Sequence, residues 1–256
     1  MHHKYFVGHK APNFKIWPDF CFFAEPDRLS PEGVFNEKLN DDRVFSEYSS
    51  LFWLCRQLNS ASPQSDDLIT ICQHRRFVLN TRMGSPAKNL PANVIAYDAI
   101  LGLNFDRELF PRFGQRYLLG SVLKFDQKMV DQYAGAHYIR DLLRFCSDLI
   151  DAGLMTDEEV NDFLNQKFMI PAPSCGTFDL QVFIGILGFL EVASEIFLKG
   201  GYKPYEDRYQ ARVLSFLLER LHSWLLLKQV IRMSLSFEHI VGFTTIVSDD
   251  PLVQPG

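Results

Sequence analysis

Residues 69–78 read ITICQHRRFV, and this stretch indicates the fold of the chain. The run LITIC at 68–72 is apolar and rich in β-branched residues, which is typical of a buried strand. Four polar or charged residues follow it directly: Gln73, His74, Arg75 and Arg76. Because ligands of open α/β sheets bind beyond the carboxyl ends of the strands, this strand end is the first place to look for a site.

The rest of the chain predicts an α/β fold. Apolar runs at 5–7 and 20–24 read as further strands, and apolar residues recur at helical spacing through 44–58. Strands that come early and long helices that come late favour an α-rich C-terminal half. No repeat or low-complexity tract marks a domain boundary, so residues 1–256 are expected to form a single domain. Further elements are predicted at 94–101 (strand), 125–149, 156–164, 178–198 and 205–227 (helices) and 240–247 (strand).

Composition narrows the classes of function. The chain has 256 residues, 23 Phe and a formal net charge of −5, so it is globular and lacks the basic bias of a nucleic-acid binder. Five scattered cysteines without a Cys-x-x-Cys pair predict neither a disulfide framework nor a structural zinc site. We expect a cytoplasmic protein, because no signal-peptide h-region is evident. The apolar run at 180–190 is too short to span a bilayer, and peripheral association with the inner face of the membrane stays open.

Arg75 and Arg76 are the first binding candidates. Two guanidinium groups beyond a strand end can hold a diphosphate through charge-assisted, bidentate hydrogen bonds. The alternative is a pair of ordinary surface arginines. If the strand continued through both residues, their side chains would point to opposite faces, and both could face one ligand only where the chain turns.

A glycine at the end of the first strand is a second candidate feature. Gly8 allows the backbone to approach a ligand closely, and His9 and Lys10 add positive charge. Without further context a plain turn is the simpler interpretation. Glu47 lies at the beginning of the helix predicted at 44–58, where a solvated helix charge is the usual case.

Two long helices carry the remaining candidates. On the first, His137 and Asp141 are one turn apart and can touch, with Gln132 nearby; the alternative is an ordinary surface pair. Zinc binding there is not expected, because no third ligand is evident. The second helix carries three candidates: Arg212, Glu219 and Arg220. The alternative for Glu219 is a solvated ion pair, which is the usual state of a Glu beside an Arg.

Several common motifs are absent from the sequence. It contains no G-x-G-x-x-G, no Walker-type loop, no G-x-S-x-G and no Asp-x-Asp. Many nucleotide-sugar transferases hold a divalent metal with Asp-x-Asp, because hard cations bind carboxylate and phosphate oxygens together. If this chain binds a diphosphate donor, arginine or lysine is expected to replace the metal, and no metal or other cofactor is predicted; a divalent ion stays the alternative.

Six segments in order resemble one family, the bacterial capsule and exopolysaccharide glycosyltransferase-like domains catalogued as a domain of unknown function. The segments are V-G-H-K at 7–10, S-E-Y-S-S-L-F-W at 46–53, C-Q-H-R-R-F at 72–77, Q-Y-A-G-A-H-Y-I-R-D at 132–141, G-T-F at 176–178 and R-V-L-S-F-L-L-E-R-L-H-S-W at 212–224. They cover most of the chain. Two positions depart from the pattern: Gln73-His74 replaces His-Tyr, and Ser215 replaces Gly.

The resemblance implies a GT-A-like, nucleotide-binding sheet and transfer of a sugar from a UDP-sugar, with a galactose-type donor plausible by similarity. The acceptor implied is a surface polysaccharide such as capsule or O-antigen, or its lipid-linked precursor. The donor would be bound by seven residues: Gly8, His9, Lys10, Glu47, His74, Arg75 and Arg76. Glu219 is the first choice of catalytic base and Asp141 the second, and four residues would orient the base or bind the acceptor: Gln132, His137, Arg212 and Arg220.

A second hypothesis is a non-catalytic domain that binds glycans or acts as a scaffold in a polysaccharide assembly complex. The altered pair Gln73-His74 motivates it, together with the segment 233–243, which could contact a partner. A third, plainer interpretation is that the helical motifs are core stripes only.

Overall fold

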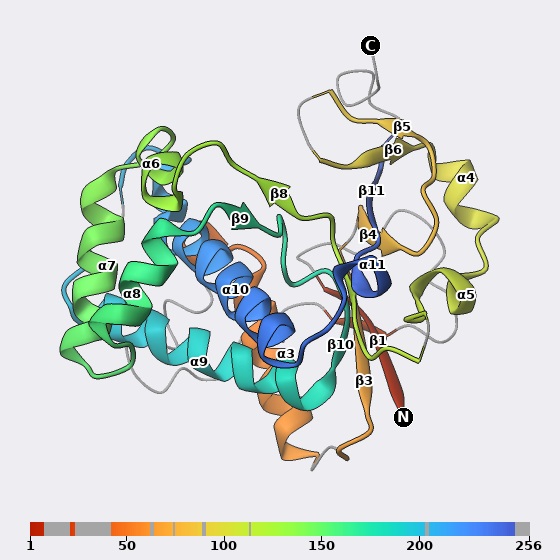
Figure 1. The fold of residues 1–256 in the computed structure, drawn as a ribbon, viewed down its shortest axis with the longest axis horizontal. Helices are drawn as coiled ribbons and strands as arrows, with labels where there is room; N and C mark the ends of the chain where they lie inside the picture. Colours follow the sequence, from red (N-terminus) through yellow and green to blue (C-terminus); the bar gives the residue numbers. More distant parts are fainter. Residues whose placement is uncertain are drawn as a thin grey trace.

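The computed structural model describes residues 1–7, 21–23, 42–61, 64–73, 75–88, 91–112, 114–202 and 205–248. A mixed sheet lies at the centre, with helices on both sides (Figure 1). Its main path runs β2-β1-β3-β4-β11-β6-β5, and β10 and β7 pair off this path beside β3. The bounds are β1 (His2–Val7), β2 (Cys21–Phe23), β3 (Leu68–Gln73), β4 (Arg76–Leu79), β5 (Ser85–Pro86), β6 (Asn93–Ile95), β7 (Leu118–Leu119), β10 (Gly176–Asp179) and β11 (Phe243–Val247).

Strand β3 is the central strand of this arrangement. It runs parallel to β1, with His2 opposite Leu68 and Val7 opposite Gln73, and antiparallel to β10. Both faces of β3 are covered, which explains why its sequence is continuously apolar instead of alternating. Because β1 and β3 are parallel, their carboxyl ends meet at one edge of the sheet, and Arg75 and Arg76 lie just beyond the end of β3.

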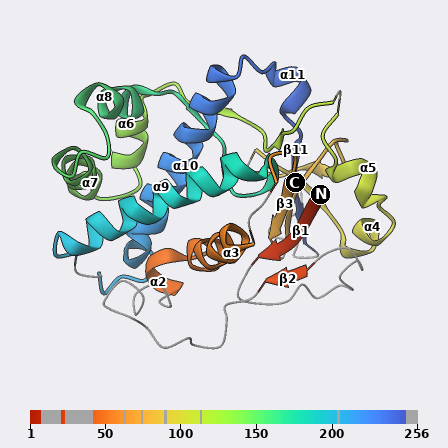
Figure 2. The ribbon, with the colours of Figure 1, turned by 90° about the horizontal axis from the view of Figure 1, so that it is seen from below.

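Helices on one side of the sheet form the larger part of the molecule (Figures 1 and 2). Two short helices, α4 (Tyr97–Leu101) and α5 (Phe105–Leu109), pack with Phe6 and Phe77 on the opposite face. The larger side contains α2 (Asp42–Phe45), α3 (Tyr48–Ser60), α6 (Met129–Ala134), α7 (Ile139–Asp151), α8 (Asp157–Asn165), α9 (Leu180–Lys199) and α10 (Val213–Arg232). A small two-stranded antiparallel sheet of β8 (Leu123–Lys124) and β9 (Phe168–Met169) and the short α11 (Phe237–Ile240) complete the fold.

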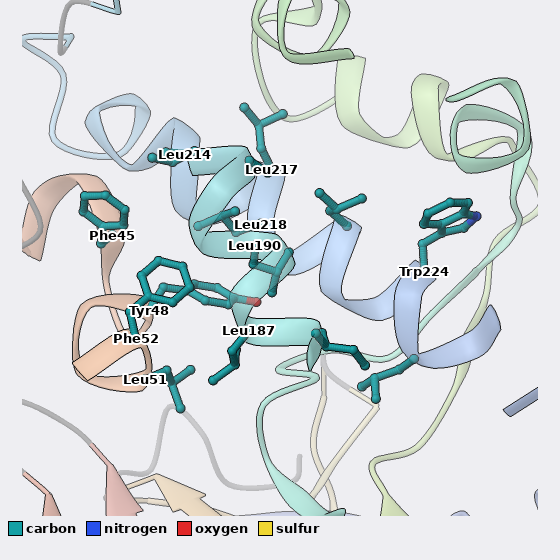
Figure 3. Close-up of a cluster of buried hydrophobic side chains, with 14 of the residues drawn as sticks. Phe45, Tyr48, Leu51, Phe52, Leu187, Leu190, Leu214, Leu217, Leu218 and Trp224 are labelled. Carbon is teal, nitrogen blue, oxygen red and sulfur yellow. The ribbon is translucent and has the colours of Figure 1, made fainter. Parts of the chain in front are cut away.

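The main core lies where α3, α9 and α10 meet (Figure 3). Phe52, Leu187 and Leu217 are fully or almost fully buried there, and each such side chain contributes roughly 2 kcal/mol through removal from water. Phe52, Leu217 and Trp224 are core residues as expected, whereas Trp53 is only partly buried. This packing fixes α10 against the sheet and so sets where its polar residues lie.

Several predicted elements differ from the observed ones, and the helix predicted at 44–58 is interrupted at Ser46 and Glu47, which separate α2 from α3. Residues 94–101 divide into β6 and α4, and residues 125–149 divide into α6 and α7 at Gly135. Residues 176–179 form β10 before α9 begins, and Gly176 is required there because a Cβ would lie 2.4 Å from the Leu118 carbonyl oxygen. The helix predicted at 205–227 begins at Val213 and ends at Arg232. The capping box of α8 is confirmed, with Thr156 and Glu159 bonding each other's backbone.

Helix α9 is longer than the apolar run at 180–190, because it continues to Lys199. Among the described residues it is the one helix whose length and composition would allow it to cross a membrane. Its inner face, however, packs against α3, α7 and α10, and 44% of its most apolar window is buried. We interpret α9 as a core helix on this evidence, because buried core helices have the same composition.

Candidate functional site

The carboxyl end of β3 gathers residues from three distant parts of the sequence. We call Glu47, Gln73, Arg76, Arg212 and Glu219 the strand-end group. Glu47 precedes the first turn of α3, and its carbonyl oxygen accepts a hydrogen bond from the Leu51 amide at 3.2 Å. The residue before it, Ser46, has a positive φ of 49°. This turn directs the chain into α3 and places Glu47 beside the end of β3.

Glu47 and Glu219 form a pair of neighbouring carboxylates. Burial raises the pKa of Glu47 above its ordinary value, and the negative charge of Glu219 raises it further. Arg76 and Arg212 act on the same carboxyl in the opposite direction. The burial and the neighbouring carboxylate have the stronger influence, so Glu47 retains its proton to a higher pH than an exposed glutamate.

Gln73 connects the two sides of the strand-end group. Its Nε2 donates to Glu47 Oε1 at 3.4 Å, and its Oε1 accepts from a guanidinium nitrogen of Arg76 at 3.3 Å. Both bonds are long, so they orient the three side chains without binding them tightly. Gln73 stands where the resembling family has histidine, and its amide carries out a bridging role that does not depend on pH.

Glu219 and Arg212 are held by polar groups of neighbouring segments. The Glu219 Oε1 atom accepts from the Ala172 amide at 2.9 Å, and Ala172 itself has a positive φ of 48°. Arg212 Nε donates to Ser46 Oγ at 2.9 Å and its guanidinium lies over the Phe216 ring. Two residues with positive φ therefore position two charged side chains of the group, which is a common feature of functional sites.

The two arginines of the strand-end group are held by neutral acceptors, as are Arg82, Arg112 and Arg220, whereas several other described arginines form ion pairs. Arg56, Arg116 and Arg144 each form an ion pair with a carboxylate. Arg76 and Arg212 form no ion pair within 4.0 Å with any described carboxylate, although both lie near Glu47. Guanidinium groups held by neutral acceptors remain available for an anionic ligand.

The chain turns between Gln73 and Arg76, and this separates the two predicted arginines. Gln73 and Arg76 face each other across the β3–β4 hairpin, so Arg76 is the first residue of a new strand. Arg75 lies in the turn with an exposed side chain, and no described contact joins it to the strand-end group. Of the predicted donor-binding residues, Gly8, His9, Lys10 and His74 lie outside the residues that the structure describes.

Four other predicted residues lie in a second cluster together with Tyr205, which was not predicted. We call this cluster the helix group: Gln132, His137, Asp141, Tyr205 and Arg220. The buried Arg220 donates through two nitrogens to Gln132 Oε1, at 2.8 and 3.1 Å, and also to the Phe216 carbonyl oxygen. Burial lowers the pKa of His137 to about 4, helped by Arg220, so this imidazole is neutral at pH 7. His137 stacks on Phe216 with ring centroids 4.1 Å apart.

Asp141 is not brought to the strand-end group. Both of its carboxylate oxygens accept from the Tyr205 hydroxyl, at 2.9 and 3.0 Å, and Arg140 donates to the same hydroxyl at 2.6 Å. Burial raises the pKa of Asp141, and the bond from Tyr205 opposes this. Its described contacts are therefore with Tyr205 and the arginines of its own helix. The structure thus brings together Glu47, Arg76, Arg212 and Glu219 and places Asp141 apart from them.

Three residues beside the strand-end group were not singled out in the sequence. Cys175 is buried, and its pKa is raised to about 12 by burial, with Arg76 and Glu47 close enough to influence it. The buried Tyr48 hydroxyl lies 3.2 Å from His222 Nδ1, and burial lowers the pKa of that histidine to about 3. Tyr48 and His222 belong to the segments 46–53 and 212–224, which is the signal that could have identified them.

Among the described residues, no group of three or more His, Cys, Asp and Glu side chains is arranged to hold a metal ion. The two carboxylates of the strand-end group are accompanied by two arginines, whose guanidinium groups suit the phosphate oxygens of a ligand.

The chain resembles a solved structure over nearly its whole length. The match is WbbM, a bifunctional glycosyltransferase solved in its apo form, with a TM-score of 0.71 and 14% sequence identity over 97% of this chain. The match covers 45% of WbbM, so the chain spans about half the length of that protein. No family model and no curated protein matches the sequence. The likeness shows the fold: a mixed central sheet flanked by helices, resembling a glycosyltransferase. The predicted α/β class is confirmed at this level, and the GT-A-like assignment stays a prediction.

Proposed function

We propose that the chain is a glycosyltransferase that moves a sugar from a nucleotide-diphosphate donor to a glycan acceptor. One observation carries the proposal: two arginines without an ion-pair partner among the described carboxylates lie beside Glu47 and Glu219 at the shared carboxyl edge of parallel strands. That edge is where α/β sheets bind their ligands. The fold shared with WbbM, a bifunctional glycosyltransferase, supports the same reaction class, with this chain corresponding to one part of such an enzyme.

The arginines suit the donor's diphosphate. Arg76 and Arg212 would neutralise its charge and stabilise the additional charge that develops as the nucleoside diphosphate leaves. Gly8, His9, Lys10 and His74 follow β1 and β3 in the sequence, so they are proposed to complete the nucleotide pocket. The proposed donor is a UDP-sugar, with a galactose-type sugar to be tested first.

Glu219 is the proposed base of an inverting reaction. The acceptor hydroxyl oxygen forms a bond to the anomeric carbon while the bond from that carbon to the diphosphate breaks. Glu219 takes the hydroxyl proton, and the diphosphate leaves with the electron pair of the broken bond. Glu219 is the better choice than Asp141, because both oxygens of Asp141 are engaged by Tyr205. Glu47, with its raised pKa, is proposed to orient the donor.

The acceptor is proposed to be a surface polysaccharide or its lipid-linked precursor, bound on the side of Arg220 and His137. Both of these residues contact Phe216, and Arg212 lies over the same ring. The helix group therefore adjoins the proposed donor site along α10. A cytoplasmic location, with peripheral association at the inner face of the membrane, is proposed to accompany this function.

The test is donor turnover by the purified chain in the presence of EDTA, measured as UDP release from UDP-galactose with and without a glycan acceptor. We expect UDP release with EDTA present. The Arg76→Ala variant should lose this release. Arg107→Ala, on the opposite face of the sheet, is the matched control. Activity that disappears on chelation would contradict the metal-free mechanism, and Arg76→Ala with unchanged UDP binding would contradict the diphosphate role.

A second candidate function is a non-catalytic glycan-binding or scaffolding domain. The observation in its favour is Gln73, whose amide joins Glu47 to Arg76 where the resembling family has a titratable histidine. A thermal-shift screen separates the two functions. Stabilisation by UDP or a UDP-sugar supports the enzyme, whereas stabilisation by oligosaccharides with no response to any nucleotide supports the binding domain.

A further inference from the structure

A groove of about 1100 Å³ lies on the larger, helical side of the molecule. The two-stranded sheet of β8 and β9, the C-terminal half of α10, and the segment from α11 into β11 surround it (Figure 1). Its walls are mostly apolar: Trp224, Leu227, Ile231, Phe237, Val241 and Phe243. Pockets of about 300–1,000 Å³ are sufficient for drug-sized ligands, so the groove can receive a sizeable apolar group.

Several side chains of this groove are unusually exposed for their type. Ile231 is 70% exposed, Phe168 46%, Phe237 40% and Phe243 37%. They come from three separate segments of the chain and converge on one hollow. Contiguous apolar surface of this kind marks a binding site, because covering it gains about 25 cal/mol for each Å² removed from water.

The charges at the groove indicate the polar end of its ligand. Lys124 lies on β8 and Lys167 directly precedes β9, which pairs with β8, and neither lysine forms an ion pair with a described carboxylate. Asp162, by contrast, accepts from Trp224 Nε1 at 2.9 Å, and Lys228 pairs with Glu159 at 3.1 Å. Glu238 is an acidic residue of the lining, contributed by α11.

We propose that this groove binds the aliphatic chain of an anionic amphiphile, with the negatively charged head group at Lys124 and Lys167. Because the site is a hollow, a single aliphatic chain can enter it, whereas a flat membrane surface would only cover its opening. The unpaired lysines favour a phosphate or carboxylate head group over a neutral one. This site does not depend on the proposed function, because it uses no residue of the strand-end group.

The groove is nevertheless physically connected to that group. Phe168 lines the groove, and the segment that follows it runs along α10: the Ile170 amide donates to Ser223 Oγ, and the Ala172 amide donates to Glu219 Oε1. A ligand that orders this segment would therefore also affect the position of Glu219.

The test is a fluorescence titration of the purified chain with dansyl-undecanoic acid as a monomer, followed by displacement with dodecyl phosphate and with dodecanol. We expect saturable binding that dodecyl phosphate displaces better than dodecanol. The combined variant Lys124→Gln/Lys167→Gln should weaken dodecyl phosphate by roughly tenfold and leave dodecanol nearly unchanged. Phe237→Ala should weaken both ligands, with Leu143→Ala, an exposed apolar residue away from the groove, as its control.

Circular dichroism of each variant confirms that it is folded, and the lysine variant alters surface residues only. The proposal is overturned by the absence of saturable binding, by equal affinities in all variants, or by binding to phosphatidylglycerol vesicles without binding to the monomeric amphiphile. This last result would assign the surface to membrane docking, and oligomerisation that the Phe237→Ala variant abolishes would assign it to a second copy of the chain.

Discussion

The strand-end group and the helix group both include side chains of α10, yet they are organised differently. In the helix group, Arg220 and Asp141 have hydrogen bonds of 2.8–3.1 Å to fixed neutral partners. In the strand-end group, Gln73 makes bonds of 3.3 and 3.4 Å, and Arg76 and Arg212 have no carboxylate partner within 4.0 Å among the described residues. Both groups hold arginines by neutral acceptors, and His137 Nδ1 of the helix group is buried without a partner among the described residues. The strand-end group differs because it places two carboxylates beside two arginines, which is typical of a ligand site.

This difference leads to separate expectations for the two groups. Substitutions in the strand-end group should change activity or binding and leave stability nearly unchanged. Substitutions in the helix group should change stability first. Four substitutions test this division.

Glu219→Gln should give the largest effect. The amide can still accept the Ala172 bond, so the fold is kept, but it cannot take a proton from the acceptor. We expect transferase turnover to fall by on the order of 10³. Steady-state rates measure this, with Glu195→Gln on the exposed side of α9 as the control. A variant with undiminished turnover and a normal fold would remove Glu219 from the mechanism.

Arg220→Ala should be the most destabilising change. It leaves a cavity and removes the partner of Gln132, at a cost of about 3 kcal/mol. Denaturant unfolding measures this cost. If the free energy of unfolding is unchanged while UDP binding is lost, the helix group would have to be reassigned from the fold to the donor.

Arg76→Ala should weaken UDP binding by roughly tenfold to a hundredfold, because it removes a charge-assisted bond to phosphate. The free energy of unfolding should change little, because Arg76 has no ion pair to lose among the described residues. Isothermal titration calorimetry measures the affinity, and Arg107→Ala serves as the control. Equal affinity in the Arg76 variant and the control would contradict the division between the groups.

Glu47→Gln should produce a small gain in stability with a defined pH dependence. Burial and Glu219 raise the pKa of Glu47 in the folded chain, so the wild-type protein loses stability as pH rises from the ordinary glutamate value through the raised one. The amide of the Glu47→Gln variant does not ionise, so the variant does not lose stability in this way as pH rises. Unfolding measured from pH 4 to pH 8 should therefore show no difference at the acidic end and a more stable variant at the neutral end. A constant difference across this range would contradict the raised pKa.

Much of the fold could be predicted from sequence because it depends on local patterns. The apolar β-branched run gave β3, the spacing of Phe52 and its neighbours gave α3, and Thr156 with Glu159 gave the beginning of α8. The divisions of 94–101 and 125–149 were missed, because a short apolar run fits a strand and a helix equally well. The pairing of β3 with β10, more than a hundred residues later, has no local signal.

The sequence indicated the residues of the candidate site, but it did not indicate which of them lie together. The ordered motifs identified Glu47, Arg76, Arg212 and Glu219, but not that these four lie together while Asp141 lies with Tyr205. Arg75 and Arg76 looked equivalent in the sequence, and only the hairpin at Gln73 separates them. Which residues lie together depends on tertiary packing around α10. The spacing of residues along one helix gives no information about that packing. The role of Gln73 as a bridge was likewise visible only in three dimensions.

The most direct test of the division between the two groups is an experimental structure of the chain with bound UDP. The account predicts the diphosphate at the carboxyl edge of β1 and β3, with the Arg76 guanidinium within hydrogen-bond distance of a phosphate oxygen. It also predicts that the bonds from Arg220 to Gln132 and from Tyr205 to Asp141 are unchanged. UDP bound at the helix group, with Arg76 in contact with no phosphate, would contradict it.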